Sequence, residues 1–118
     1  MADYDTNELN VKEGMEYAMD DPELYADILR TYLDETAEEL IRMDQYLADD
    51  NMSEYATLVH AVKSGSRLIG AMDLGDEALD LEQKSKAGDT EYIRAHHDHL
   101  KEHVNKVFEA VNGYLAGA

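Results

Sequence analysis

The chain has 118 residues and a formal net charge of −17, with 27 Asp or Glu residues, 10 Lys or Arg residues and no cysteine. This charge excludes nonspecific binding to nucleic acid or to an anionic membrane, and the missing thiols exclude disulfides and cysteine metal sites. One proline and seven glycines leave few helix breakers in a chain rich in Ala, Leu and Glu. The composition therefore favours a single helical domain over residues 1–118.

A short first helix is expected over Asn7–Ala18, with Leu9, Val11 and Met15 as its apolar contacts. Residues 1–6 would form a loose acidic N-terminus without the apolar core of a signal peptide. No apolar run in the sequence reaches the ~20 residues that cross a bilayer, so we expect a cytoplasmic protein without a membrane partner.

Two longer helices follow, and each has a start signal. Asp21-Pro22 combines an N-cap acid with a proline at the first helical position, and the helix should run to about Ala48. Asn51, with Glu54 three residues later, resembles a capping box and should open a third helix. That helix reaches Ile69, where Gly70 can end it.

The last two helices are separated by Gly88-Asp89, which reads as a C-terminal glycine followed by a new N-cap. The fourth helix is expected from Met72 to about Ala87, and the fifth carries apolar residues at helical spacing from Ile93 to Leu115. Short linkers make successive helices antiparallel neighbours. The prediction is an all-α, up-down antiparallel four-helix bundle with a short additional N-terminal helix and a core over about residues 11–115.

The third predicted helix places a histidine among cations. At ~100° per residue, Lys63, Ser64 and Arg67 lie within about 60° of His60, and the apolar stripe lies opposite. No acidic residue occurs from Tyr55 to Met72. An exposed imidazole can accept a phosphoryl group, and nearby cations stabilise its charge. By geometry alone, an ordinary surface histidine fits this pattern equally well.

The stretch Leu58–Leu74 resembles the signature of histidine-containing phosphotransfer (HPt) domains. The segments from Asp21 to Leu29 and from Leu81 to Ile93 resemble the second helix and the junction of the fourth and fifth helices in that family, so the likeness covers about Val11–Leu115. The matching signature positions are His60, Val62, Lys63, Ile69, Gly70, Ala71 and Leu74.

The resemblance implies a phosphorelay intermediate in which His60 exchanges a phosphoryl group with the aspartate of a response-regulator receiver domain. Lys63 would assist the phosphoryl group electrostatically. From their places on and beside the same helix face, Ser64, Arg67, Ala56 and Leu68 are predicted to bind the partner, although a salt bridge to a local acid fits Arg67 equally well and core packing fits Leu68 equally well. The partner would be a receiver domain, a hybrid histidine kinase, or both. The receiver would supply the divalent metal, and this chain would be a monomeric phosphocarrier with no cofactor and no ATP-binding motif. Met1 and the complete bundle favour a free-standing carrier over a piece of a larger kinase.

One departure from the family pattern concerns the residues after the lysine. Many members have Gly-Ser there, whereas this chain has Ser64-Gly65. Ser64 would place a hydroxyl beside His60, where it could bond the phosphoryl group or the carbonyl of His60. Gly65 would face the core and allow close packing, at a cost of ~1 kcal/mol in helix propensity.

Two further hypotheses remain open at this point. The chain could be a helical scaffold that binds a signalling protein and is never phosphorylated. It could also bind a metal through His99 and His103, whose i,i+4 spacing suits two ligands on one helix. A solvated helix face explains the histidines from His96 to His103 more simply, so we predict no metal site.

Overall fold

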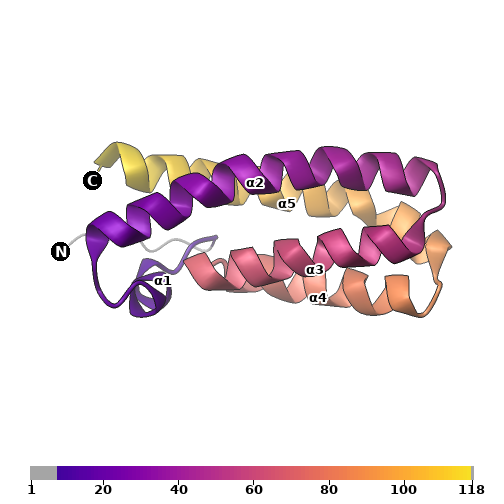
Figure 1. The fold of residues 1–118 in the computed structure, drawn as a ribbon, viewed down its shortest axis with the longest axis horizontal. Coiled ribbons are helices and arrows are strands. Elements are labelled where there is room, and N and C mark those ends of the chain that lie inside the picture. The colour runs from indigo at the N-terminus through magenta and orange to yellow at the C-terminus, as the bar shows by residue number, and fades with distance from the viewer. Residues whose placement is uncertain (1–7, 118) are drawn as a thin grey trace.

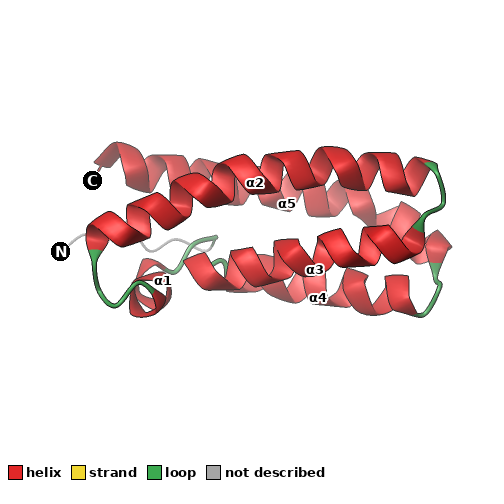
Figure 2. Ribbon diagram, in the orientation of Figure 1, coloured by secondary structure: helices red, strands yellow, loops and turns green. Residues whose placement is uncertain are grey.

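A computed structural model describes residues 8–117 of the chain, and within that range it consists of helices and short loops (Figure 2). The all-α prediction is therefore confirmed. The bounds of the helices follow their expected punctuation closely. They are α1 (Val11–Tyr17), α2 (Pro22–Ala48), α3 (Met52–Ile69), α4 (Met72–Lys86) and α5 (Thr90–Gly117).

The four long helices form an up-down bundle in which α2 and α5 make one side and α3 and α4 the other (Figure 1). Each long helix packs against the next one in the chain, and α2 also packs against α5, so the bundle closes. The short α1 contacts α3 and α2 at the end of the bundle where α2 begins. None of the helices in residues 8–117 is long and apolar enough to cross a membrane.

Side-chain caps start α2 and α3 at the expected residues, and a glycine ends α3. The Asp21 carboxylate accepts hydrogen bonds from the backbone of Glu23 and Leu24, and the Asn51 side chain accepts one from the backbone of Glu54. Gly70 ends α3 in the left-handed conformation, with φ +97°. These caps satisfy backbone donors and acceptors that a helix end leaves free.

The predicted start of the first helix is wrong. Asn10 is extended, and its side chain accepts a hydrogen bond from the backbone of Glu13, so the helix begins at Val11. Asn7, where that helix was expected to start, lies outside the described residues, as does the predicted acidic segment 1–6. The start of the helix is determined by the cap at Asn10 and not by the spacing of the apolar residues.

The tyrosines of the core are bonded inside the bundle. The hydroxyl of Tyr25 donates to the carbonyl oxygen of Ile69 at 2.7 Å, and the hydroxyls of Tyr32 and Ser66 lie 3.0 Å apart. A tyrosine in the core usually keeps its hydroxyl paired, because an unpaired buried polar group is costly. These contacts join α2 to α3 and fix how far the two helices are shifted along one another.

A third tyrosine joins α3 to α5. The Tyr55 hydroxyl lies 2.9 Å from Nδ1 of His97, and Nε2 of that ring lies 2.6 Å from an Asp44 carboxylate oxygen. His97 is almost fully buried, so it is a core residue. Together, these three residues connect α2, α3 and α5 in one polar chain that leads from the core to the partly exposed Asp44.

Candidate functional site

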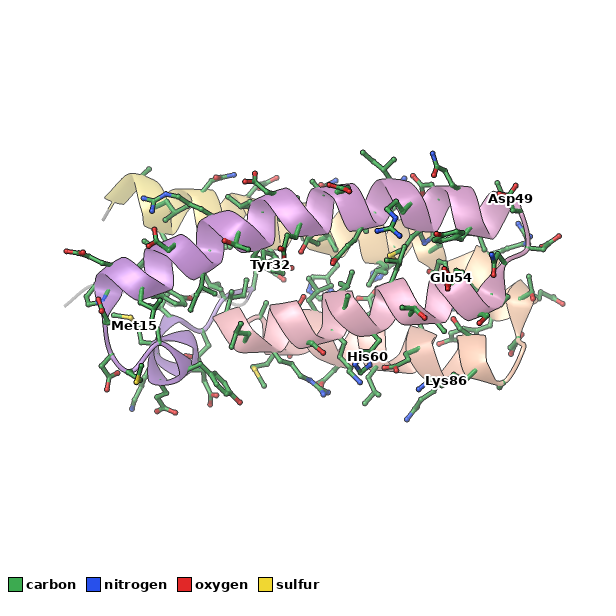
Figure 3. The ribbon with its side chains drawn as sticks, viewed as in Figure 1. Met15, Tyr32, Asp49, Glu54, His60 and Lys86 are labelled. Carbon is green, nitrogen blue, oxygen red and sulfur yellow. The ribbon has the colours of Figure 1, made fainter. Side chains whose placement is uncertain are left out.

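His60 lies near the middle of α3, and its side chain is 57% exposed. The opposite face of the helix supplies core residues such as Val59 and Val62, which are fully buried. In Figure 3, His60 and Lys86 point to the same side of the α3–α4 pair. The amphipathic pattern of α3 thus holds the imidazole at the surface on a helix packed along its length.

A single carboxylate from α4 organises the site. Oε2 of Glu82 lies 2.9 Å from Nδ1 of His60 and 3.0 Å from Nζ of Lys86, and Oε1 lies 2.7 Å from Nζ of Lys63. The Glu82 side chain is only 4% exposed, so these donors replace most of its water. The two helices therefore meet through one buried anion and three donors around it.

The ionised carboxylate of Glu82 determines which ring nitrogen of His60 carries the proton. Burial alone would raise the pKa of Glu82, but the hydrogen bonds from Lys63, Lys86 and His60 prevail and lower it to about 2. An ionised carboxylate only accepts hydrogen bonds, so Nδ1 must carry the ring proton. In the neutral imidazole, the lone pair then lies on Nε2, to which no described residue hydrogen-bonds.

A shallow groove between α3 and α4 surrounds the imidazole. Its lining beside His60 and Glu82 includes Ser53, Ala56 and Thr57 from α3, together with Lys86 from α4. Ala56, predicted to bind the partner, is 8% exposed, so it forms part of the groove wall and does not project from it. Small side chains on this side leave room for another protein to approach the ring.

The other predicted site residues do not line this groove, and they differ in exposure. Lys63 is only 15% exposed, because its ammonium group is held against Glu82. Ser64 is exposed, and Arg67 pairs with Asp76 of α4 at 3.2 Å. Leu68 is 40% exposed and follows His60 around the helix by about 80°. The cations are therefore engaged with α4, whereas Leu68 belongs to the flank that faces α2.

Sequence reasoning missed Glu82 and Lys86. Both lie on α4, more than 20 residues after His60, and no local pattern connects them to it. The available signal was their i,i+4 spacing, which places a glutamate and a lysine on one helix face. Deciding that this face meets His60 required the shift between α3 and α4, which the sequence does not give.

Two histidines of α5, His99 and His103, contact carboxylates of neighbouring elements. Nδ1 of His99 and Nδ1 of His103 lie 2.8 and 2.7 Å from the two carboxylate oxygens of Glu77, and Nε2 of His103 lies 2.9 Å from Glu8. Within residues 8–117, no group of three or more His, Cys, Asp or Glu side chains is arranged to hold a metal ion. These side chains link α5 to α4 and to the segment before α1.

The described part of the chain is a helical bundle that holds the imidazole of His60 at its surface, beside cations and small residues. The family model of the Hpt domain matches residues 27–110, which is more than half of the chain, and the chain belongs to that family. Comparison with curated proteins gave no match, and neither did comparison with solved structures. Hpt domains carry phosphoryl groups on histidine in two-component phosphorelays, interacting with response regulators and kinases, and are carriers and not kinases themselves.

Proposed function

We propose that this chain is a phosphorelay intermediate that accepts a phosphoryl group on Nε2 of His60 and returns it, in exchange with the aspartate of a receiver domain. The observation that carries the proposal is the 2.9 Å contact between Nδ1 of His60 and the ionised Glu82. That contact leaves the lone pair on the exposed nitrogen. A histidine without such a partner would divide its proton between both nitrogens.

The transfer step has a simple balance of charge. The Nε2 lone pair attacks the phosphorus of the partner's aspartyl phosphate, a P–N bond forms, and the P–O bond breaks to release the aspartate carboxylate. The ring keeps its Nδ1 proton and becomes positively charged when it is phosphorylated. The buried Glu82 carboxylate, 2.9 Å away, stabilises that positive charge, and the reverse reaction restores the neutral imidazole.

The two lysines at Glu82 differ in their freedom. Lys63 is largely buried and supplies its positive charge from a fixed position on α3. Lys86 is 67% exposed at the edge of the groove and can turn from Glu82 toward a phosphoryl group on His60. We therefore assign Lys63 to holding Glu82 and to the local field, and Lys86 to direct contact with the phosphoryl oxygens.

The partner contributes the remaining groups. The receiver domain supplies the aspartate and a divalent metal that neutralises the transferred group, so this chain needs no cofactor of its own. Ser64 and Arg67 form the rim of the docking area, beside the ring and over α4. The small residues Ala56 and Thr57 let the acidic pocket of the partner approach the imidazole closely.

The test is labelling from a phosphorylated receiver domain, or from a kinase of the same organism. Wild-type protein should become labelled and should pass the label to a second receiver, and His60→Gln should not be labelled. The matched control is His96→Gln, because His96 is an exposed histidine on α5 away from the groove. Equal labelling of His60→Gln and wild type would overturn the proposal, and a wild type that accepts no label from any donor would favour a scaffold.

A further inference from the structure

Ser64 carries a hydroxyl one helical turn after His60. The two residues lie four apart on α3, so their side chains are neighbours on one face, with Cβ atoms about 5–6 Å apart, and both are exposed. Many members of the family have glycine at this position. In this chain the glycine is Gly65, which turns toward α2, where its Cβ position lies 3.4 Å from the Tyr32 ring. His60 therefore has beside it a hydroxyl that many members lack.

The Ser64 hydroxyl has no hydrogen-bond partner within residues 8–117. Serine and threonine inside a helix often donate to the carbonyl oxygen four residues earlier. The hydroxyls of Thr57 and Ser85, which line the groove beside the imidazole, do so at 3.3 and 2.7 Å. For Ser64 the corresponding acceptor is the carbonyl of His60, and that bond is not formed. One of the two acceptors that the sequence allows for Ser64 is therefore not used.

The lysines of the site lie on the other side of the ring. At ~100° per residue, Lys63 lies about 60° from His60 toward α4, and Ser64 lies about 40° from it toward α2. Lys86 also approaches from α4. A phosphoryl group presents three acceptor oxygens, so donors on α4 leave the side toward α2 for another donor. Thr57 also lies toward α2, but its hydroxyl is already bonded to the backbone.

We propose that the Ser64 hydroxyl donates a hydrogen bond to an oxygen of the phosphoryl group on His60 and so stabilises the phosphorylated carrier. This inference rests on the proposed function, because it concerns the group that His60 would carry. The bond forms only after transfer, since the hydroxyl has no acceptor before it. Ser64 gives up no proton and forms no covalent bond. Its effect is therefore on the equilibrium between phosphohistidine on this chain and aspartyl phosphate on the partner.

The test measures that equilibrium between the full chain and a receiver domain that has been shown to exchange phosphoryl groups with it. Ser64→Ala removes the hydroxyl and preserves the helix, because alanine has the highest helix propensity. The equilibrium constant for phosphorylation of His60 should fall by about three- to tenfold, the effect of losing one hydrogen bond to a charged group at an exposed position. Ser64→Thr keeps a hydroxyl on the same carbon and should stay within about twofold of wild type.

Two further variants serve as controls. Thr90→Ala removes a hydroxyl from the first residue of α5, outside the groove at His60, and should leave the equilibrium constant within about twofold of wild type. Ser64→Gly removes the hydroxyl together with its carbon. It should lower the equilibrium constant as Ser64→Ala does, because the hydroxyl and not the size of the side chain is responsible.

A purely steric role for Ser64 gives a different result. If the side chain only hindered the approach of the partner, Ser64→Ala and Ser64→Gly would speed transfer in both directions and leave the equilibrium constant unchanged. That result would overturn the inference, and so would a Ser64→Thr variant as impaired as Ser64→Ala. In either case, labelling of His60 in the wild type would leave the proposed function intact. A wild-type chain that accepts no label on His60 would refute both.

Discussion

Nδ1 of His60 and Oε2 of Glu82 lie 2.9 Å apart across the interface of α3 and α4. A residue of α4 therefore determines which ring nitrogen of a histidine on α3 faces the solvent. Under the proposed function, this relationship makes α4 part of the phosphoacceptor site and not only a support for it. It also makes the site dependent on how the two helices are shifted along each other, a property that can be tested by substitution on α4 alone.

Replacing the carboxylate should change the tautomer of His60. In Glu82→Gln, the ring no longer faces an anion, and we expect a substantial fraction of the proton to move to Nε2. Nitrogen NMR of the imidazole would show a mainly Nδ1-protonated ring in the wild type and a mixture in the variant. Phosphotransfer should slow by about tenfold, as when a residue that orients a functional histidine is lost. An unchanged tautomer in the variant would contradict the role assigned to Glu82.

Substitution should distinguish the roles of Lys63 and Lys86. Lys86→Gln should slow phosphotransfer by about three- to tenfold and leave the tautomer of His60 unchanged, because it removes a cation that acts on the phosphoryl oxygens. Lys63→Gln should disturb Glu82 and shift the tautomer as well. Lys12→Gln, at an exposed position of α1, is the control for loss of one positive charge. If Lys86→Gln transferred as fast as that control, Lys86 would not contact the phosphoryl group.

Stability should fall in acid because of Glu82. The pKa of this carboxyl is lowered from its ordinary value of 4.5 to about 2 in the folded chain, so the unfolded chain binds its proton first as the pH falls. The contribution is complete above about pH 5 and is lost progressively toward pH 2. Urea unfolding at pH 6 and pH 3 should show that wild type loses about 1–2 kcal/mol more than Glu82→Gln between the two values. Equal losses would mean that the pKa of Glu82 is not lowered.

The junction of α1 with α3 depends on two glycines whose missing side chains allow backbone contact. A Cβ at Gly14 would lie 2.3 Å from the carbonyl oxygen of Ile69, and one at Gly70 would lie 2.0 Å from that of Asn10. Gly14→Ala and Gly70→Ala should therefore each lower the free energy of unfolding by about 2 kcal/mol or more.

The control for these glycines lies on α5. Gly113 has open space around its Cβ position, and alanine favours the helix by up to ~1 kcal/mol, so Gly113→Ala should be neutral or stabilising. Thermal unfolding of the three variants measures the difference. A Gly14→Ala variant as stable as Gly113→Ala would show that α1 can shift away from α3 at little cost.

The buried contact between Tyr55 and His97 gives a further stability test. Tyr55→Phe removes the hydroxyl that contacts Nδ1 of His97 and leaves a buried ring nitrogen without its partner. The free energy of unfolding should fall by about 1–3 kcal/mol. Tyr17→Phe, at a residue that is 61% exposed, should be within about 0.5 kcal/mol of wild type. A similar small effect for both would imply that water replaces the lost hydroxyl.

The sequence was sufficient for features that depend on one helix at a time. Caps such as Asp21 and Asn51 and the apolar spacing of α3 predicted the helix starts and the exposure of His60. Features that depend on how two helices pack together could not be predicted from the sequence. The contact with Glu82 and the internal bonds of the core tyrosines follow from distances between helices, which no local pattern encodes. The predicted start of α1 was wrong on local grounds, because the side chain of Asn10 caps a helix that begins at Val11.

The tight turn between α3 and α4 makes the site recognisable in sequences whose structures have not been determined. Since only Gly70 and Ala71 separate the two helices, the number of residues from His60 to Glu82 is fixed by geometry, and one inserted residue would rotate the carboxylate by about 100°. The arrangement can therefore be written as a spacing: a histidine, then lysine at +3, glycine at +10, glutamate at +22 and lysine at +26. A search with this spacing should separate carriers whose imidazole proton is held by a carboxylate from those that hold it by other means.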